Sequence, residues 1–446
     1  MQIELSKYLS VSGVNFIRVL WCDNANVIRA KAIHIGALSH HFEHGVGISA
    51  AQQALPVMYD AVVPESGLSP VGEIRLMPDW STLNLLPYAP KQARVMGDMV
   101  CDGLPWAICP RNFLKRMVGE AASEGLDVMT AFENEFYLLR NSPDGLGIEP
   151  ADNTVFGSTL AMDLNQKVID EIAEALVAQN IPVEQYYPES GRGQHEISVR
   201  YTKALSAADQ QIAFRETVHA VALRHGLKAS FLPKIFADQA GSGCHINMSL
   251  WQGGHNLVPE VTGIEGLSRI ARAFIAGILH HLPALMALTT PSPNSYRRIR
   301  PHCWSGAFRC WGVDNREAAV RVPSDPATLR PTNFEIKTVD ASANPYLALG
   351  AIIAAGLDGV RRRLLPGEPV RVDPGYLSPE ERTARGIDLL PKNLGEAIAH
   401  LKHDEMLLNA LGSELAQAYI AVRSAEWEAL KDMELDAEVK LLLQRY

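Results

Sequence analysis

Apolar and polar residues alternate along two neighbouring segments near the start of the chain, 14–23 and 27–35. A period of two is typical of half-buried strands, and the Asp-Asn-Ala-Asn sequence between the segments favours a turn. Further short strands are expected over residues 79–100, and the stretch 50–72, which contains several prolines and glycines, is expected to form a long loop. We therefore predict a small mixed domain over residues 1–100.

Helical periodicity, in which apolar residues recur every three or four positions, predominates after residue 100. Helices are predicted over residues 110–125, 164–179, 206–226, 264–281, 341–364 and 394–446. The first begins with Pro110 and closes at Gly125, and the third opens with Ser206-x-x-Asp209, which resembles a capping box. The pattern predicts an α+β protein whose second, larger domain spans residues 101–446, with acidic strands on one face and helices behind them.

The most distinctive polar positions are five glutamates and one histidine in strand-like or glycine-rich segments. They are Glu133, Glu135, Glu189, Glu196, His245 and Glu335. The segment AFENEFYLL alternates and is predicted to be a strand, so Glu133 and Glu135 should project from the same face. Carboxylates that converge in one pocket repel each other unless a cation neutralises them, and oxygen-rich sets suit Mg²⁺ or Mn²⁺ better than Zn²⁺.

Each of these motifs taken alone is more often structural, since a single E-x-E on a strand usually lies on a solvated face. The five glutamates together favour a paired metal site, because unpaired buried carboxylates are costly. Two such ions are what an enzyme needs to hold ATP phosphates and a developing phosphoryl charge. The HHFEH sequence at residues 40–44 lacks the partners of a zinc site and is expected to be a solvated helix end.

Bulk composition narrows the possible partners. The chain has 446 residues and a net charge of −9, which makes a nucleic-acid partner unlikely on electrostatic grounds. The longest apolar stretch, taken as residues 346–357, is too short to span a bilayer, so no membrane partner is expected. The N-terminus has no signal-peptide pattern, and the six cysteines form no C-x-x-C pair, so a reduced, cytoplasmic protein is expected.

Taken together, the sequence resembles the glutamine synthetase superfamily, most closely its bacterial type I branch. The segments that carry the resemblance occur in the order NFIRVLWCDNANVIRAKAI, ARVMGDMVCDGLPWAICPRNFLKR, ENEFYLL, GRGQHEIS, LPKIFADQAGSGCHINMSL, NSYRRIRP, DNREAAVRVP and FEIKTVDASANPYLALGAIIAAGLDG. The resemblance implies an N-terminal β-grasp domain and a catalytic domain with a curved antiparallel sheet. It also implies a homo-oligomer, expected to be a dodecamer of two hexameric rings with each active site at a subunit boundary.

The resemblance also implies roles for individual residues. Glu135, Glu189 and Glu196 match the ligands of one Mg²⁺, and Glu133, His245 and Glu335 match those of the second. Arg298 matches the arginine that grips the α-carboxylate of glutamate, and Gly241 matches a glycine whose backbone approaches that substrate. Arg316 and Arg321 match arginines that serve the γ-phosphoryl group and ATP, and Asn247 and Ser249 are expected in the nucleotide site. Planar guanidinium groups suit both carboxylate and phosphate.

Two departures from the family pattern concern the incoming nitrogen. Members that use ammonia carry a glutamate in a flap, and Trp304 occupies that position here. They also take an aspartate from a neighbouring subunit, and Ser49 replaces it. A small cation is held poorly without carboxylates, whereas an indole can attract an alkylammonium group by about 0.5–2 kcal/mol. Arg298, Arg316 and Trp304 are therefore the expected catalytic set, with Ser49 and Trp304 lining the amine site.

Other departures concern the acid substrate and the nucleotide. Ala240 replaces an asparagine, Asn333 and Lys337 replace two arginines, and Asn247 replaces a histidine. Lys337 keeps the charge expected near the substrate but lacks the bidentate fork. A regulatory adenylylation tyrosine has no counterpart near residues 389–394.

The favoured hypothesis is an ATP- and Mg²⁺- (or Mn²⁺-) dependent ligase that joins the γ-carboxylate of glutamate to an organic amine through an acyl phosphate. A diamine should need an acid at the far end of its pocket, whereas the altered loop offers Cys303, Trp304, Phe308 and Trp311. These side chains either contact the amine or pack the flap, and a monoamine is favoured. The alternatives are an ammonia-using glutamine synthetase with an altered site, and a non-catalytic member of the family.

Overall fold

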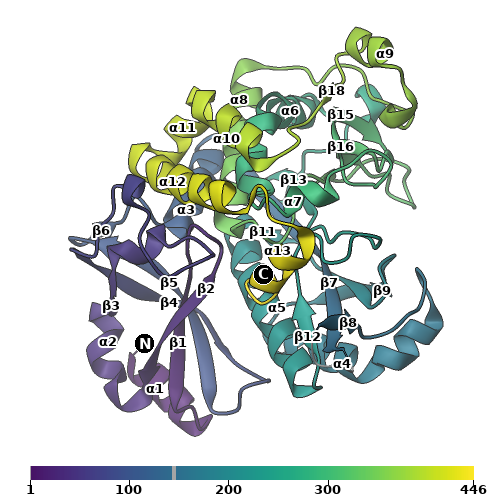
Figure 1. Cartoon of the computed structure of the whole chain (residues 1–446). Helices are drawn as coiled ribbons and strands as arrows, with labels where there is room; N and C mark the ends of the chain where they lie inside the picture. The colour runs from purple at the N-terminus through teal and green to yellow at the C-terminus, as the bar shows by residue number, and fades with distance from the viewer. Residues whose placement is uncertain (1, 143–146) are drawn as a thin grey trace.

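The computed structural model describes residues 2–142 and 147–446, which form two sheets and a large set of helices (Figure 1). The N-terminal sheet contains β1 (Phe16–Cys22), β2 (Ile28–His34), β3 (Val46–Ser49), β4 (Glu73–Leu85), β5 (Gln92–Cys101) and β6 (Leu104–Pro105). Its order is β2-β1-β5-β4-β3, with β6 paired to β5. Only β1 and β5 run parallel among these described strands. Two helices, α1 (Gln2–Val11) and α2 (Leu38–His44), accompany this sheet.

The first two predicted strands are confirmed, and the turn between them has a structural role. Asn26 adopts the left-handed conformation (φ 63°) and donates from its side chain to the carbonyl oxygen of Ala341 at 2.8 Å. The tip of the hairpin is fully buried, so it joins the N-terminal sheet to the catalytic region. The strands predicted over residues 79–100 are confirmed with a shifted start, because β4 begins at Glu73 and runs through Pro78, and the break before β5 contains Pro87 and Pro90.

The segment expected to be a long loop also contains short 3-10 helices. The 3-10 helices of the chain are η1 (Ile35–Ala37), η2 (Ala50–Ala54), η3 (Pro64–Ser66), η4 (Ile264–Gly266) and η5 (Pro374–Tyr376). Helix α2 ends at His44, as the HHFEH pattern indicated.

A second sheet forms the centre of the catalytic region. Its strands are β7 (Asp127–Asn141), β8 (Ile148–Pro150), β9 (Val183–Pro188), β10 (Gln194–Val199), β11 (Thr202–Lys203), β12 (Lys228–Ser230), β13 (Ile246–Gln252), β14 (His255–Asn256), β15 (Phe308–Val313), β16 (Ala318–Val322), β17 (Phe334–Ile336) and β18 (Asp388–Leu389). The main path is β18-β15-β16-β17-β13-β7-β10-β9. Every pair is antiparallel except β15 with β16, so the expected antiparallel sheet is correct apart from that one parallel pair within the described chain.

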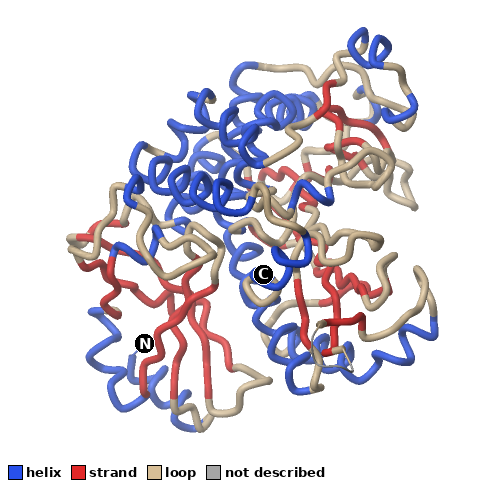
Figure 2. The backbone as a smooth tube through the Cα atoms, viewed as in Figure 1, coloured by secondary structure: helices blue, strands red, loops and turns tan. Residues whose placement is uncertain are grey.

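Helices pack together beside this sheet (Figure 2). They are α3 (Pro110–Ser123), α4 (Thr159–Val177), α5 (Ala204–Arg224), α6 (Arg269–Thr289), α7 (Ser295–Arg298), α8 (Pro345–Arg362), α9 (Pro379–Ala384), α10 (Leu394–His403), α11 (Glu405–Leu411), α12 (Ser413–Leu430) and α13 (Leu435–Leu442). Helices α3 and α5 pack against β7, and α8 packs against α3, α5 and α6. Helix α6 is long and apolar enough to cross a membrane by composition, but 78 % of its apolar window is buried inside the protein.

Two predicted helix starts were wrong, and local contacts explain why. Helix α5 begins at Ala204 rather than at a Ser206 cap, because the preceding residues pair with β7 and lead directly into the helix. The Asp209 carboxylate, expected in a capping box, instead accepts hydrogen bonds from Arg111. Helix α6 begins at Arg269, where the Ser268 side chain caps it, and it continues through Pro283 to Thr289.

Other predicted helices are confirmed with shifted ends. Helix α3 begins with Pro110 at its first turn as expected, and α4 begins at Thr159, five residues earlier than predicted. Helix α8 lies within the predicted 341–364 segment, where Asn344 caps its first turn. The segment expected to be helical throughout from Leu394 is instead divided into α10, α11, α12 and α13.

Arg111 links the N-terminal sheet to helix α5 of the catalytic region. Its buried guanidinium, on α3, donates to Asp79 of β4 at 2.8 Å and to Asp98 of β5 at 2.6 Å. The same group forms two hydrogen bonds with Asp209 of α5, at 2.9 and 2.8 Å. One buried cation therefore neutralises carboxylates from both parts of the chain and fixes how the N-terminal sheet sits on the catalytic helices.

Candidate functional site

Strand alternation and register place the acidic residues on one face of the catalytic sheet. Ala131, Glu133 and Glu135 alternate along β7 and therefore share a face. Glu196 of β10 lies directly opposite Glu135, and Tyr187 of β9 lies opposite Glu196. Because residues directly opposite each other in antiparallel strands project to the same side, this row continues across three strands.

The same rule extends the row in the other direction. Asn247 of β13 lies opposite Ala131 on one side and opposite Glu335 of β17 on the other. Glu335 in turn lies opposite Arg321 of β16. Residues more than 200 positions apart in sequence, such as Ala131 and Glu335, are thus aligned on one surface by hydrogen-bond register alone.

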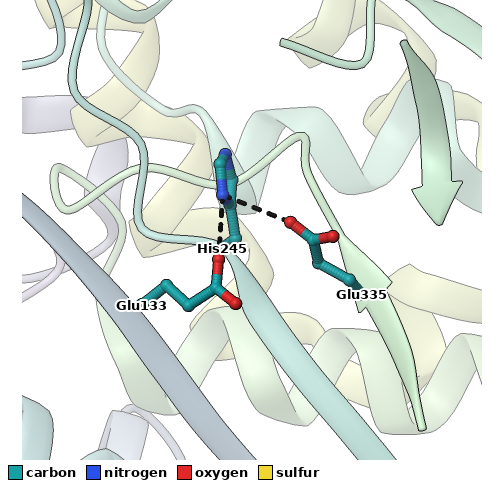
Figure 3. Close-up of side chains that lie close together, drawn as sticks. All are labelled: Glu133, His245 and Glu335. Carbon is teal, nitrogen blue, oxygen red and sulfur yellow. Dashed lines mark hydrogen bonds and ion pairs between the residues drawn. The ribbon is translucent and has the colours of Figure 1, made fainter. Parts of the chain in front are cut away.

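Glu133, His245 and Glu335 form the tightest group on this surface (Figure 3). His245 Nδ1 lies 3.3 Å from Glu133 Oε2 and 3.3 Å from Glu335 Oε1. One candidate ligand atom from each residue lies within 4.8 Å of the other two. Burial, and then the charge of Lys337, hold the pKa of His245 well below its usual value, so the ring is neutral and able to act as a ligand.

Glu135, Glu189 and Glu196 form a second, adjacent group of acids. Burial and the charge of Glu189 raise the pKa of Glu135 to about 7. Burial and the charges of Glu133 and Glu135 raise the pKa of Glu196 to about 9. Burial also raises the pKa of Glu189. Such a group takes up protons unless a cation is bound among its members, which is the electrostatic signature of an acidic metal site.

A glycine-rich loop passes close to both groups. Gly243 donates its backbone N–H to Glu135 Oε2 at 2.9 Å, and a Cβ at this position would lie 2.6 Å from His245 Nε2. A Cβ at Gly241 would lie 2.5 Å from Cγ of Arg298 and 2.7 Å from the carbonyl oxygen of Pro233. Neither position has room for a side chain, so the two glycines allow the loop backbone to approach the site closely.

Three cationic side chains border the acids. Lys337 Nζ donates to Glu335 Oε1 at 3.1 Å, and Arg321 Nη1 donates to Glu335 Oε2 at 3.0 Å. Arg298 is 7 % exposed and donates to the carbonyl oxygen of Val339 at 3.0 Å. Its Nε–H has no hydrogen-bond partner within the described residues, so this buried guanidinium retains a donor for an anionic ligand.

Asn247 and Ser249, expected near the nucleotide, lie two residues apart on β13. The Asn247 side chain donates to Glu133 Oε1 at 2.7 Å and accepts from Asn333 at 2.6 Å. Ser249 Oγ accepts a hydrogen bond from Trp251 Nε1 at 2.9 Å. Asn333 therefore holds Asn247, and Asn247 in turn orients Glu133 by a hydrogen bond. The family pattern has other residues at both asparagine positions.

The structure does not join Arg316, Trp304 or Ser49 to the acidic groups. No hydrogen bond or ion pair within the described residues connects Arg316 to them, and its guanidinium lies 5.7 Å from the centroid of the Trp304 ring. Trp304 is 60 % exposed. Ser49 ends β3 of the N-terminal sheet and caps η2. Phe308 and Trp311 are buried in the core and pack rather than line a site.

Sequence reasoning missed three residues that orient the acids. The side-chain amide of Gln194 donates to Gly241 O and to Ser242 Oγ, both at 3.1 Å, and approaches Glu135 Oε2 at 3.4 Å. The Tyr187 hydroxyl interacts with Glu196, and Gly243 donates to Glu135 as described above. The alternation of Gln194 with Glu196 on one strand was the available signal for the first of these.

The donor set fits divalent metal ions. Five carboxylates and one neutral imidazole converge, burial raises the pKa values of Glu135, Glu189 and Glu196, and His245 Nε2 is buried without a partner within the described residues. Oxygen-rich ligands of this kind suit Mg²⁺ or Mn²⁺. The neighbouring cations Arg298, Arg321 and Lys337 add positive charge at the rim, so the surface is suited to anionic substrates such as carboxylates and phosphates.

Comparisons with known proteins match almost the full length of the chain to one family. The family model of the glutamine synthetase catalytic domain matches residues 107–442, and that of the glutamine synthetase N-terminal domain matches residues 2–106. Type-1 glutamine synthetase 1 of Dictyostelium discoideum is 36 % identical, covering 100 % of this chain and 92 % of the relative. Gamma-glutamylpolyamine synthetase GlnA3 of Streptomyces coelicolor is 38 % identical, covering 97 % and 94 %. A solved GmaS–ADP complex is similar with a TM-score of 0.86 at 31 % identity, covering 99 % of both chains.

Proposed function

The chain belongs to the glutamine synthetase family of carbon–nitrogen ligases, and we propose that it uses ATP to join the γ-carboxylate of glutamate to an organic amine. The observation that carries the proposal is the combination of a full acidic set with an indole at the flap position. The acids and His245 converge on one sheet face, and Arg298 keeps a free buried donor beside them. Similarity to a gamma-glutamylpolyamine synthetase supports the amine as nucleophile.

We assign the acids to two metal positions. Glu133, His245 and Glu335 would hold one divalent ion, and Glu135, Glu189 and Glu196 would hold the other. Bound divalent ions neutralise phosphate charge and the charge that develops during phosphoryl transfer. Arg298 would bind the α-carboxylate of glutamate, with the Gly241 backbone beside it, while Arg321 and Lys337 would meet phosphate or carboxylate oxygens at the rim.

The chemistry proceeds in two balanced steps. A γ-carboxylate oxygen of glutamate attacks the terminal phosphorus of ATP, ADP leaves, and an acyl phosphate forms. An alkylammonium substrate first loses one proton, and the neutral amine then attacks the acyl carbon. The C–O bond to phosphate breaks, phosphate leaves, and the nitrogen releases a second proton to solvent as the amide forms. Arginines around the site stabilise the transferring group, and closure against water prevents hydrolysis of the acyl phosphate.

Phosphate release from ATP tests the proposal. Purified protein would be assayed with glutamate, Mg²⁺ and ATP against a panel of monoamines, diamines, polyamines and ammonium. We expect organic amines to outperform ammonium, with dependence on glutamate in every case and monoamines preferred. Equal or better turnover with ammonium would favour a glutamine synthetase with an altered site. Failure to bind ATP in the presence of Mg²⁺, measured by calorimetry, would favour a non-catalytic member.

We further propose that the enzyme is a homo-oligomer, with the dodecamer of two hexameric rings as the expected form, acting in the cytoplasm. The family resemblance supports assembly, because the position that Ser49 occupies at the end of β3 matches one that serves the active site of a neighbouring subunit. All six cysteines are unpaired, which fits a reducing compartment. Light scattering of the purified protein tests the assembly: a monomeric, active protein would contradict it.

A further inference from the structure

The segment 300–306, which we name the flap, begins and ends beside the candidate site. Two residues before it, Arg298 donates to the carbonyl oxygens of Val339 and Lys337. At its end, a Cβ at Gly306 would lie 3.1 Å from Cβ of Lys337. Within the flap, Ser305 Oγ accepts from the Arg300 N–H at 2.9 Å and donates to the Arg300 carbonyl oxygen at 2.8 Å, which closes the loop on itself.

A buried carboxylate holds the middle of the flap. Glu317 Oε1 accepts the backbone N–H of Trp304 at 2.8 Å, and Oε2 accepts the backbone N–H of His302 at 3.2 Å. Glu317 is only 5 % exposed, and its own N–H donates to Asn315 Oδ1 at 3.0 Å. Both carboxylate oxygens are therefore directed at the flap backbone from a fixed position at the start of β16.

The flap conformation needs this acceptor. His302 (φ 61°) and Trp304 (φ 52°) both adopt the left-handed region, which residues with large side chains rarely occupy. The backbone N–H groups of residues 302 and 304, on either side of Cys303, both point toward one anion, the Glu317 carboxylate. Hydrogen bonds to an ionised acceptor are among the stronger ones, so they can stabilise a backbone that would otherwise relax.

The residue before Glu317 acts on the Trp304 side chain. The Arg316 guanidinium lies 5.7 Å from the centroid of the indole ring, within the range of a cation–π contact. Adjacent residues thus hold Trp304 in two ways, through its backbone N–H and through its ring. The indole remains 60 % exposed and is available to a ligand.

Other contacts anchor the flap from a different side. His302 Nδ1 lies 2.8 Å from Asp373 Oδ2, and its ring packs against Tyr376 with centroids 4.7 Å apart. These contacts involve His302 alone among the flap residues. A change at Asp373 therefore loosens one end of the bend, whereas a change at Glu317 releases both N–H groups, including that of Trp304.

We propose that Glu317 is a positioning residue that fixes the Trp304 indole at the amine site and so sets the preference for organic amines over ammonium. This inference rests on the proposed function, because it takes the flap to border the incoming amine. Glu317 itself does not contact substrate, since both of its oxygens are occupied by backbone N–H groups. The carboxylate at 317 and the indole at 304 therefore operate as a pair.

The test compares Glu317→Ala, Glu317→Gln and Glu317→Asp with Asp373→Asn, and uses Glu368→Gln, an exposed position, as the matched control. For Glu317→Ala we expect the KM for the preferred amine to rise about tenfold or more, with the KM values for glutamate and ATP within about twofold of wild type. Glu317→Gln should be intermediate, because one acceptor oxygen remains, and Glu317→Asp should recover part of the selectivity. Asp373→Asn should have a smaller effect and Glu368→Gln none.

A second readout keeps the inference independent of activity. The fluorescence anisotropy of Trp304 is obtained by subtracting the polarised emission of the Trp304→Phe protein from that of the protein that retains Trp304. We expect this anisotropy to fall in Glu317→Ala, with an unchanged unfolding midpoint. An unchanged anisotropy and amine KM in Glu317→Ala would overturn the inference, as would equal losses for all three substrates. If the wild type itself prefers ammonium, the proposed function fails, and a preserved anisotropy difference still assigns Glu317 as the residue that positions Trp304.

Discussion

Replacing Gly243 by alanine perturbs the candidate metal site with a single methyl group. The Cβ would lie 2.6 Å from His245 Nε2 and 3.1 Å from Glu135 Oε1, and each of these residues belongs to a different metal position in our assignment. Ordinary contact begins at 3.4 Å, so the buried imidazole must move by roughly 0.8 Å, several times the ~0.2 Å tolerance of a metal–ligand distance. Gly243 has no left-handed φ, so the backbone itself accepts alanine.

The expected result is a loss of metal affinity without unfolding. Groups that orient metal ligands typically alter affinity about 10- to 100-fold when they are changed, and we expect Gly243→Ala to weaken Mn²⁺ binding within that range. Calorimetric titration of Mn²⁺ into metal-free protein measures the affinity, and the thermal unfolding midpoint reports the fold. Gly119→Ala is the control, because Gly119 is exposed on α3 and its Cβ would contact nothing within 4 Å.

The control should bind Mn²⁺ as the wild type does and unfold at the same or a slightly higher temperature, since alanine favours a helix over glycine. A Gly243→Ala protein with wild-type affinity would refute the placement of His245 and Glu135 beside the metal ions. If Gly243→Ala lowered both the unfolding midpoint and the Mn²⁺ affinity, the loss of affinity would reflect a general packing defect, and the predicted local effect on the metal site would be wrong.

Three further perturbations test other parts of the account. Glu335→Ala should reduce turnover more than about 100-fold while the protein stays folded, since several kcal/mol of charge stabilisation depend on the metal that Glu335 would hold. Steady-state kinetics measures turnover, and circular dichroism measures folding. Arg111→Met should lower the free energy of unfolding by about 3–5 kcal/mol, measured by denaturant titration, because it removes the cation that neutralises the buried Asp209 carboxylate and leaves that charge with the hydrogen bond from the Tyr346 hydroxyl. Burial lowers the pKa of His281, but the hydrogen bonds that its ring donates to Asp404 and Asp358 outweigh burial and raise that pKa. A raised folded-state pKa stabilises most at low pH, so the stability advantage of wild type over His281→Gln should be full below about pH 6 and should shrink as pH rises through the folded pKa.

Each of these three predictions would be contradicted by a specific outcome. Full activity of Glu335→Ala would remove this residue from the metal site. A change of less than about 1 kcal/mol for Arg111→Met would mean that the link between the N-terminal sheet and helix α5 is solvated and weak. For His281, a difference in unfolding midpoint that is constant across neutral and alkaline pH would show that the ring is held as a neutral group.

Local patterns were sufficient for much of the site. Alternation in AFENEFYLL correctly placed Glu133 and Glu135 on one face of β7, because a period of two follows from strand geometry alone. Which strands lie beside β7 could not be derived from alternation. The register that sets Glu335 opposite Asn247, and Glu196 opposite Glu135, depends on long-range pairing that only the folded sheet fixes.

Capping signals failed where tertiary contacts competed with them. Asp209 suited a capping box in sequence, yet its carboxylate binds Arg111 and the Tyr346 hydroxyl from distant parts of the chain. Helix α6 was predicted to end at residue 281, but it continues through Pro283 to Thr289 in a buried segment whose packing tolerates the missing hydrogen bond. The role of Glu317 was not predicted, because no local sequence pattern marks a glutamate whose carboxylate accepts hydrogen bonds from a loop that precedes it in the chain.

Competition between nucleophiles tests the central claim most directly. Wild-type protein would be given glutamate, ATP and Mg²⁺ with ammonium and the preferred organic amine at equal concentrations, and the products would be identified by mass spectrometry. We expect the γ-glutamyl amide of the organic amine to predominate, with one phosphate released per amide formed. Glutamine as the main product would contradict the account, because it would show that the surface around Trp304 still selects ammonia.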